Sequence, residues 1–452
     1  MRNLLLAPLS ILFLCYFFNF DFYISLSLSF FSFLAARFFI NLNYFFSFRE
    51  FFLFHYGLNY LFSPAISYQL NQELFVYGMR INSELYFSII LPAFVFLYFG
   101  LYFFRSNLFS ISFSLTRFWA LINESILKYW ILFGFTLRFI LPLFPTEFSF
   151  FLYVGSMIRF VAAFSLFSLD RIKYKWYLFL VIFFELYFAI SNAMFHDLLM
   201  WVIFFIIFIA YAHKITFRTK TLFCFFMLFF LFFIQSIKVE YRSRTWIGGE
   251  ESGMITFLNS GSKVFGQSSE NSIFAEANFL NSLTRLNQAW IFSSVVDRMD
   301  RVRDFQDLRL IGIYLESAFL PRFLAPNKIK SGDKELFNQY SGHTIKEGTS
   351  MGLGVFSDGY IAFGTVGVWV FAFFFGLLFS IVFKIVESWS KISPFFVLFI
   401  FPILNYAVRP DCELQTILGH LVKATLVFGL IMLYYRRYFE RELEISRPIQ
   451  VK

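Results

Sequence analysis

The sequence predicts an all-α, polytopic transmembrane helix bundle, and two observations predict it. Hydrophobic residues occupy 59% of the 452 positions and charged residues only 15%, against about 45–50% and about 25% in an ordinary soluble domain. Long apolar runs also recur along the chain, and runs such as TLFCFFMLFFLFFIQSI at residues 221–237 are apolar on every face for the length of a spanning helix. A barrel would instead show short segments of alternating hydrophobicity. The fold class is therefore all-α and membrane-embedded.

Windows of about 20 apolar residues predict about twelve membrane spans. The predicted spans are residues 3–20, 23–47, 51–68, 86–104, 126–144, 148–168, 173–190, 195–212, 220–238, 356–383, 393–409 and 413–435. The third is the weakest, because His55, Asn59 and Pro64 interrupt it. The first run has no small-residue cleavage signature, so we expect it to remain as the first span.

These spans divide the chain into four predicted regions. Residues 1–238 form the first nine spans, residues 239–350 form one long hydrophilic segment inserted in the bundle, residues 351–435 form the last three spans, and residues 436–452 form a basic tail.

The basic residues of the short loops predict the orientation. Lys and Arg in short loops stay on the cytoplasmic side, and clusters around Arg117, Lys173 and Lys214 fall on the same side as the basic tail when there are about twelve spans. We therefore expect an inner-membrane protein with both termini in the cytoplasm and residues 239–350 outside. That segment holds 13 basic and 13 acidic residues, so the net charge of +9 lies entirely elsewhere. Such a distribution favours contact with anionic inner-leaflet lipid and gives no reason to expect a nucleic-acid partner.

The cysteines predict neither a disulfide framework nor a metal site. Cys15, Cys224 and Cys412 lie in or beside apolar runs, without CxxC spacing and without a His partner. No metal and no cofactor are expected.

The start of the outward segment carries two closely spaced guanidinium groups. The run YRSRTW at residues 241–246 places Arg242 and Arg244 near the outer interface. Two guanidinium groups can clamp a phosphate or pyrophosphate in bidentate fashion. The alternative is an interfacial basic anchor, with Tyr241 and Trp246 in the aromatic belt.

Further along the segment, other cations become candidates for binding an anion. Residues 275–316 read as helical, and most of their alternating charges fit a solvated helix face, but Arg285 has a more apolar surround. In the run at residues 319–333, two prolines flank Arg322, and Lys328 follows. Prolines hold such a stretch in an extended turn, which can present a cation rigidly, although an ordinary re-entry turn has the same signature.

The Gly-rich stretch at residues 341–378 contains the candidate acid–base groups. Asp358 lies at the entry of a predicted span, where an ionisable residue is a functional candidate by default. His343 is the one histidine of the outward segment and can act as acid or base, although a lone surface histidine is often incidental. Asp197 and Arg409 are also expected on the outer side, where a polar residue at a helix start can simply cap the helix.

Several of these features together resemble a known family. The chain combines many spans, a late outward segment, YRSRTW, LPRFLAPNK and a re-entry with an acidic residue, Tyr and Phe-Gly. This pattern is similar to bacterial O-antigen and exopolysaccharide repeat-unit polymerases, which are polytopic inner-membrane proteins. The re-entry matches at Asp358, Tyr360, Phe363 and Gly364 and departs at Ala362, where the family has Asn.

The resemblance, which covers roughly residues 191–376, implies glycosyl transfer at the outer face of the cytoplasmic membrane. The donor would be a glycan repeat on a polyprenyl pyrophosphate, and the acceptor a sugar hydroxyl of a second lipid-linked unit. Cations stabilise the charge that develops on the leaving pyrophosphate. The residues assigned to binding of pyrophosphate or glycan are Arg242, Arg244, Arg285, Arg322, Lys328 and Tyr360, and the base is Asp358 or His343. Expected partners are the lipid-linked glycan, membrane lipid, and a chain-length regulator or flippase.

Other functions fit the same sequence. An O-antigen ligase uses the same donor chemistry and transfers the finished glycan to lipid A core. A non-enzymatic polysaccharide or lipid transporter would line a path with cations deep in several spans, yet Arg138, Arg159 and Lys423 are among the few cations found there. A structural membrane protein whose loop binds a partner is a third alternative.

Overall fold

A computed structural model of the chain describes residues 2–43, 47–70, 77–104, 123–266, 286–320, 328–329, 332–345 and 351–445. In these ranges the regular structure is helical, without strands. Eight helical segments are long and apolar enough to cross a membrane, which confirms a helical membrane protein. They are Phe22–Asn41, Ser83–Leu101, Glu124–Leu143, Phe148–Leu169, Arg171–Ser191, His196–His213, Val355–Ser390 and Leu414–Tyr438.

The helices follow the order of the predicted spans. They are α1 (Arg2–Phe17), α2 (Phe22–Asn41), α3 (Phe48–Gly57), η1 (Leu58–Phe62), α4 (Ser63–Gln69), α5 (Ser83–Leu101), α7 (Glu124–Ile140), η3 (Leu141–Leu143), α8 (Thr146–Ser156), α9 (Ile158–Leu169), α10 (Arg171–Ser191), α11 (His196–His213), α12 (Phe217–Arg242), η4 (Ser243–Ile247), α13 (Met254–Gly266), α15 (Ala289–Val302), α16 (Asp307–Phe319), α17 (Lys334–Ser341), α18 (Val355–Ser390), η6 (Pro394–Phe399), α19 (Ile400–Leu404) and α20 (Leu414–Ile445).

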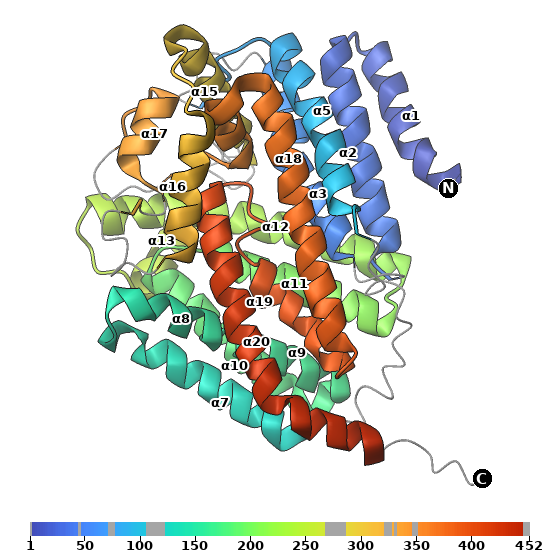
Figure 1. Ribbon diagram of the computed structural model, residues 1–452, viewed down its shortest axis with the longest axis vertical. Helices are drawn as coiled ribbons and strands as arrows, with labels where there is room; N and C mark the ends of the chain where they lie inside the picture. The colour runs from blue at the N-terminus through green and yellow to red at the C-terminus, as the bar shows by residue number, and fades with distance from the viewer. Residues whose placement is uncertain are drawn as a thin grey trace.

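One half of the bundle is built on α5 and α18, which run alongside each other (Figure 1). Glycines let the two backbones meet: a Cβ at Gly100 would lie 2.0 Å from the carbonyl oxygen of Phe373, and a Cβ at Gly376 would lie 2.4 Å from that of Leu97. Small residues permit this approach in membrane proteins. Helix α2 packs against α5 on its other side, and α1 packs against α2 at the edge of the bundle (Figure 1).

Several predicted spans are broken in the structure. The third span is three pieces, because a π-helical turn, η1, separates α3 from α4. The run at residues 148–168 breaks at Met157, between α8 and α9. The run at residues 393–409 ends early at Leu404 and continues as an irregular loop, residues 405–413, that leads into α20. Irregular backbone at membrane depth is tolerated where protein buries it, and most of this loop is buried.

The helix α18 also changes direction near its start. Phe363 and Gly364 have non-helical backbone angles, and Gly364 has a φ of 62°, which glycine adopts without strain. The first turns therefore fold back on the rest of the helix, so that a Cβ at Gly367 would lie 2.0 Å from the carbonyl oxygen of Gly359.

The long hydrophilic segment packs on the bundle. Its helices α15 and α16 contact α18 and α20 respectively. Figure 1 shows α15, α16 and α17 together at the end of the bundle opposite the C-terminus. We call this the α15 end.

Candidate functional site

A large polar cleft opens at the α15 end, with a volume of about 1090 Å³. Four parts of the chain form it: the start of α2, the connection from α4 to α5, helix α15, and helix α17 with the residues after it. Its lining residues are Asp21, Ile24, Ser67, Tyr68, Gln69, Met79, Arg80, Ile81, Asn82, Ser83, Ser294, Asp297, Arg298, Arg301, Ser341, Gly342 and His343. Helix caps hold two of these walls, because Asp21 accepts from the backbone N–H of Tyr23 at the start of α2 and Asn82 accepts from that of Leu85 at the start of α5.

Three arginines line the cleft, and they differ in their partners. Arg301 is paired with Asp297 one helical turn away, at 2.7 Å. Arg80 and Arg298 are exposed, and neither guanidinium forms a hydrogen bond or ion pair with a residue that the structure describes. The described walls of the cleft therefore carry two guanidinium groups that form no ion pair with a described carboxylate, a setting that favours binding of an anion.

His343 lines the same cleft. Its Nε2 atom lies 3.0 Å from the hydroxyl oxygen of Ser294, and its ring packs edge-on against Trp290. Partial burial and the nearby positive charge of Arg80 hold the pKa of His343 below its usual value. The imidazole is therefore neutral at pH 7 and has a nitrogen that can accept a proton.

The hydrogen bonds around Ser294 favour one of the two ring nitrogens as that acceptor. The Ser294 hydroxyl donates its one proton to the carbonyl oxygen of Trp290, at 2.8 Å. Both contacts of the hydroxyl are satisfied together when it accepts from the Nε2–H of His343. In the neutral ring Nδ1 is then the unprotonated nitrogen and the one available as a base.

Asp358 does not line the cleft. Its side chain is fully buried, with Oδ1 accepting from the hydroxyl of Tyr314 at 2.8 Å and Oδ2 accepting from the backbone N–H of Leu414 at 2.7 Å. The second bond caps α20. Beside it, Glu413 accepts from the backbone N–H of Gly332. This pair of carboxylates ties α16, α18 and α20 together.

Tyr360 lies two residues after Asp358 and faces α15. Its hydroxyl donates to Asp300 at 2.6 Å. The side chain is buried and does not line the cleft. Its contact holds α15, which carries Arg298, against the start of α18.

Arg242 and Arg244 do not line the cleft either. Arg242 donates through Nε and Nη2 to the carbonyl oxygen of Ala193, at 3.1 and 2.8 Å, and stacks on the ring of Trp246. Arg244 is paired with Glu240 at 3.0 Å. The structure thus gives both guanidinium groups protein partners.

The remaining predicted cations are placed as follows. Arg285 and Arg322 lie outside the described residues. Lys328 donates to the carbonyl oxygens of Ser317 and Leu320, at 3.2 and 3.0 Å, at the end of α16. Such contacts satisfy carbonyl groups that a helix end leaves without partners.

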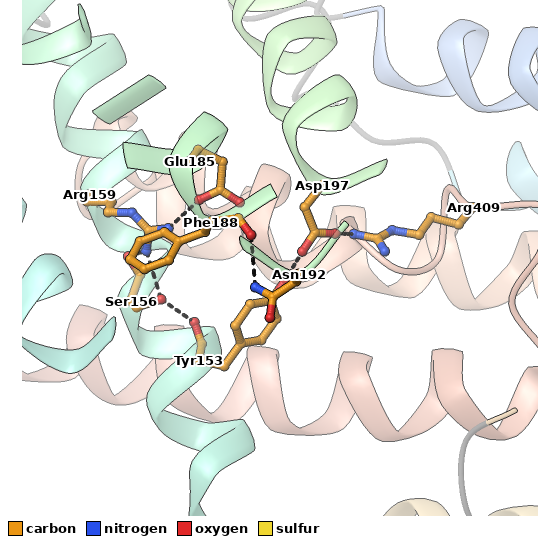
Figure 2. A network of polar contacts seen from close by, with 8 residues as sticks. All are labelled: Tyr153, Ser156, Arg159, Glu185, Phe188, Asn192, Asp197 and Arg409. Carbon is orange, nitrogen blue, oxygen red and sulfur yellow. Dashed lines mark hydrogen bonds and ion pairs between the residues drawn. The ribbon is translucent and has the colours of Figure 1, made fainter. Parts of the chain in front are cut away.

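A buried polar network crosses the other half of the bundle (Figure 2). Arg159 of α9 is paired with Glu185 of α10 at 2.7 Å, and both side chains are buried. Nearby, the hydroxyl of Tyr153 donates to Asp197 at 2.6 Å, and Asp197 is paired with Arg409. This second ion pair anchors the loop at residues 405–413 to α11, and the hydrogen bond from Tyr153 connects α8 to the same carboxylate.

The sequence marked Asp197 and Arg409 as polar sites, but not their pairing. Arg159 and Glu185 had a clear signal, since each is a charged residue within a long apolar run. No sequence signal distinguished Arg80 and Arg298, because single arginines in hydrophilic stretches look like ordinary surface residues. Only the folded chain brings these two arginines to one cleft.

A family model described as "Domain of unknown function (DUF8712)" matches residues 65–392. The chain belongs to this family. No curated protein and no solved structure matches it significantly. In this DUF8712 chain the matched region contains Arg80, Arg298 and His343 and runs from α5 through α18, whereas α1 and α20 lie outside it.

Proposed function

We propose that the protein is a membrane glycosyltransferase that joins polyprenyl-pyrophosphate-linked oligosaccharide repeat units in the cleft at the α15 end. The observation that carries the proposal is the combination in one polar cleft of Arg80, Arg298 and a neutral His343. Guanidinium groups bind phosphate oxygens, and a neutral imidazole accepts a proton. Glycosyl transfer from a lipid pyrophosphate needs both at one place.

In the proposed reaction an acceptor sugar hydroxyl attacks the anomeric carbon of the donor. The new glycosidic bond forms as the bond between that carbon and the pyrophosphate oxygen breaks, and the bonding electrons leave with the pyrophosphate. Arg80 and Arg298 stabilise the charge that develops there. The hydroxyl proton passes to Nδ1 of His343. This scheme assigns the base to His343 rather than to Asp358, whose two oxygens are occupied in the interior.

The proposal includes a location and a topology. The protein lies in the cytoplasmic membrane with about twelve spans, both termini in the cytoplasm and the α15 end outside, which follows from the basic short loops. The cleft then faces the side on which lipid-linked repeats are assembled into polymer. A chain-length regulator or a flippase would be a partner on that membrane.

The test supplies lipid-linked repeat units to membranes that contain the protein and measures a ladder of longer glycans. Arg80→Gln and Arg298→Gln should each lower the rate of ladder formation by about a hundredfold, the usual effect of removing one group that stabilises transition-state charge. The matched control is Arg309→Gln, because Arg309 is an exposed arginine of the same hydrophilic segment that does not line the cleft.

Equal ladders from all three variants would overturn the assignment of the cleft. Transfer to lipid A core instead of to a second repeat unit would identify a ligase, since the two enzymes share the donor and differ in the acceptor.

A further inference from the structure

A second cavity, an apolar groove of about 420 Å³, lies beside α1 and α2. Its walls are almost entirely hydrocarbon. They include Ala7 of α1, Leu28 and Ala35 of α2, and Phe62 and Ile66 of η1 and α4. The groove is open to its surroundings rather than sealed, and nothing in the proposed chemistry of the cleft uses it.

The groove adjoins the polar cleft. On α2, Ile24 lines the cleft and Leu28 lines the groove, and the two residues are one helical turn apart. On α4, Ser67 lines the cleft and the preceding residue, Ile66, lines the groove. The polar cleft and the apolar groove therefore lie next to each other along α2 and α4.

The groove also faces the lipid. α1 lies at the outer edge of the bundle, against α2 (Figure 1). Its outward positions are strongly exposed and apolar, with Leu9 60% and Phe13 69% exposed. In a membrane such a helix is surrounded by acyl chains, so a lipid chain can reach the groove from the side without crossing water.

We infer that the isoprenoid chain of the lipid-linked substrate lies in this groove, with its pyrophosphate at Arg80 and Arg298 in the cleft. This inference rests on the proposed function. The two guanidinium groups suit a pyrophosphate, which carries more charge than the phosphodiester of a phospholipid. An isoprenoid pyrophosphate has one hydrocarbon chain to place in a groove of about 420 Å³, whereas a phospholipid has two.

The test uses geranylgeranyl pyrophosphate with a benzophenone at the end of its chain, and the full-length protein in phosphatidylcholine nanodiscs. Illumination should attach the probe to peptides containing residues 7–15, 28–36 or 62–66. Ala35→Phe fills the groove and should weaken binding by about tenfold, or about 1.4 kcal/mol. The control, Leu26→Phe, changes an exposed position of the same helix that does not line the groove and should bind normally.

Two outcomes overturn the inference: attachment to peptides elsewhere in the bundle, and equal attachment of a phosphatidylglycerol that carries benzophenone on its acyl chain. The assay needs no turnover, so it separates the two proposals. Specific labelling of the groove without ladder formation would uphold the lipid site and contradict the glycosyltransferase. A normal ladder from Ala35→Phe, with labelling elsewhere, would contradict the lipid site and leave the glycosyltransferase proposal standing.

Discussion

His343 is the residue whose chemistry depends most on its surroundings. Burial and the charge of Arg80 both favour the neutral ring, so the pKa lies below the usual value for histidine. A base works only when it is unprotonated. The protein should therefore keep its activity to a lower pH than an ordinary histidine base would allow, and lose it as the pH falls through this lowered pKa.

Arg80→Gln removes one of the two causes of that shift. The pKa of His343 should rise toward its usual value, so the acidic limb of the rate profile should move to higher pH. Ladder formation measured across the acidic range should show this displacement, in addition to the lower rate caused by weaker substrate binding. The control, Arg309→Gln, should leave the acidic limb of the rate profile where it is in the wild type. If the acidic limbs of the wild type and Arg80→Gln coincide, His343 is not the base.

Asp358 illustrates the limit of residue-level prediction. An acidic residue at the entry of an apolar run suggests catalysis, but its partners Tyr314 and Leu414 are 44 and 56 positions away. Local sequence patterns do not predict contacts between residues so far apart along the chain. The structure gives this carboxylate the role of a buried acceptor that caps α20.

Asp358→Ala should therefore destabilise the protein by about 1–3 kcal/mol, the cost of leaving buried donors without an acceptor. Thermal unfolding in detergent measures the loss. Asp358→Asn should retain turnover per folded molecule, because the side chain keeps one acceptor oxygen. If that variant folds normally and loses all turnover, Asp358 is the base and the present assignment is wrong.

At the scale of helices, the apolar runs located most segments well, since a stretch of about 20 apolar residues has few alternatives in a membrane. The expectation for residues 173–190, for example, corresponds to α10 at Arg171–Ser191. The breaks at Met157 and after Leu404 were not foreseen. Both lie in apolar sequence, where hydropathy is the same for a continuous helix and for one that tertiary contacts interrupt.

The α5 and α18 pair gives a prediction at this scale. Gly100→Ala would place a methyl group 2.0 Å from the Phe373 carbonyl oxygen, so the helices must separate. Overpacking costs about 1–3 kcal/mol, and a lower thermal unfolding temperature in detergent should result. Gly312→Ala is the control: nothing lies within 4 Å of a Cβ there, and alanine favours a helix. Equal unfolding temperatures for both variants would show that the close approach is not required.

At the scale of the whole molecule, the sequence predicted a helical membrane protein but not where its cations gather. Arg242 and Arg244 stood out because they are neighbours in sequence, yet both are engaged with protein groups. Arg80 and Arg298 lie far apart along the chain, and only the packing of α15 beside the start of α5 brings them to one cleft. A site assembled from distant segments has no signature in local composition.

The proposed orientation can be measured in a variant without native cysteines. Ser262→Cys, exposed on α13, should react with a membrane-impermeant maleimide in intact cells. Ser388→Cys, exposed near the opposite end of α18, should react only after the membrane is permeabilised. The reverse pattern would place the cleft on the cytoplasmic side and contradict the proposed topology.

The most direct test of the central claim is an experimental structure of the protein with a non-transferable lipid pyrophosphate sugar bound in nanodiscs. We expect density for the two phosphates between the guanidinium groups of Arg80 and Arg298, with the sugar toward His343. Phosphate density beside Arg242 and Arg244, with the cleft empty, would contradict the account.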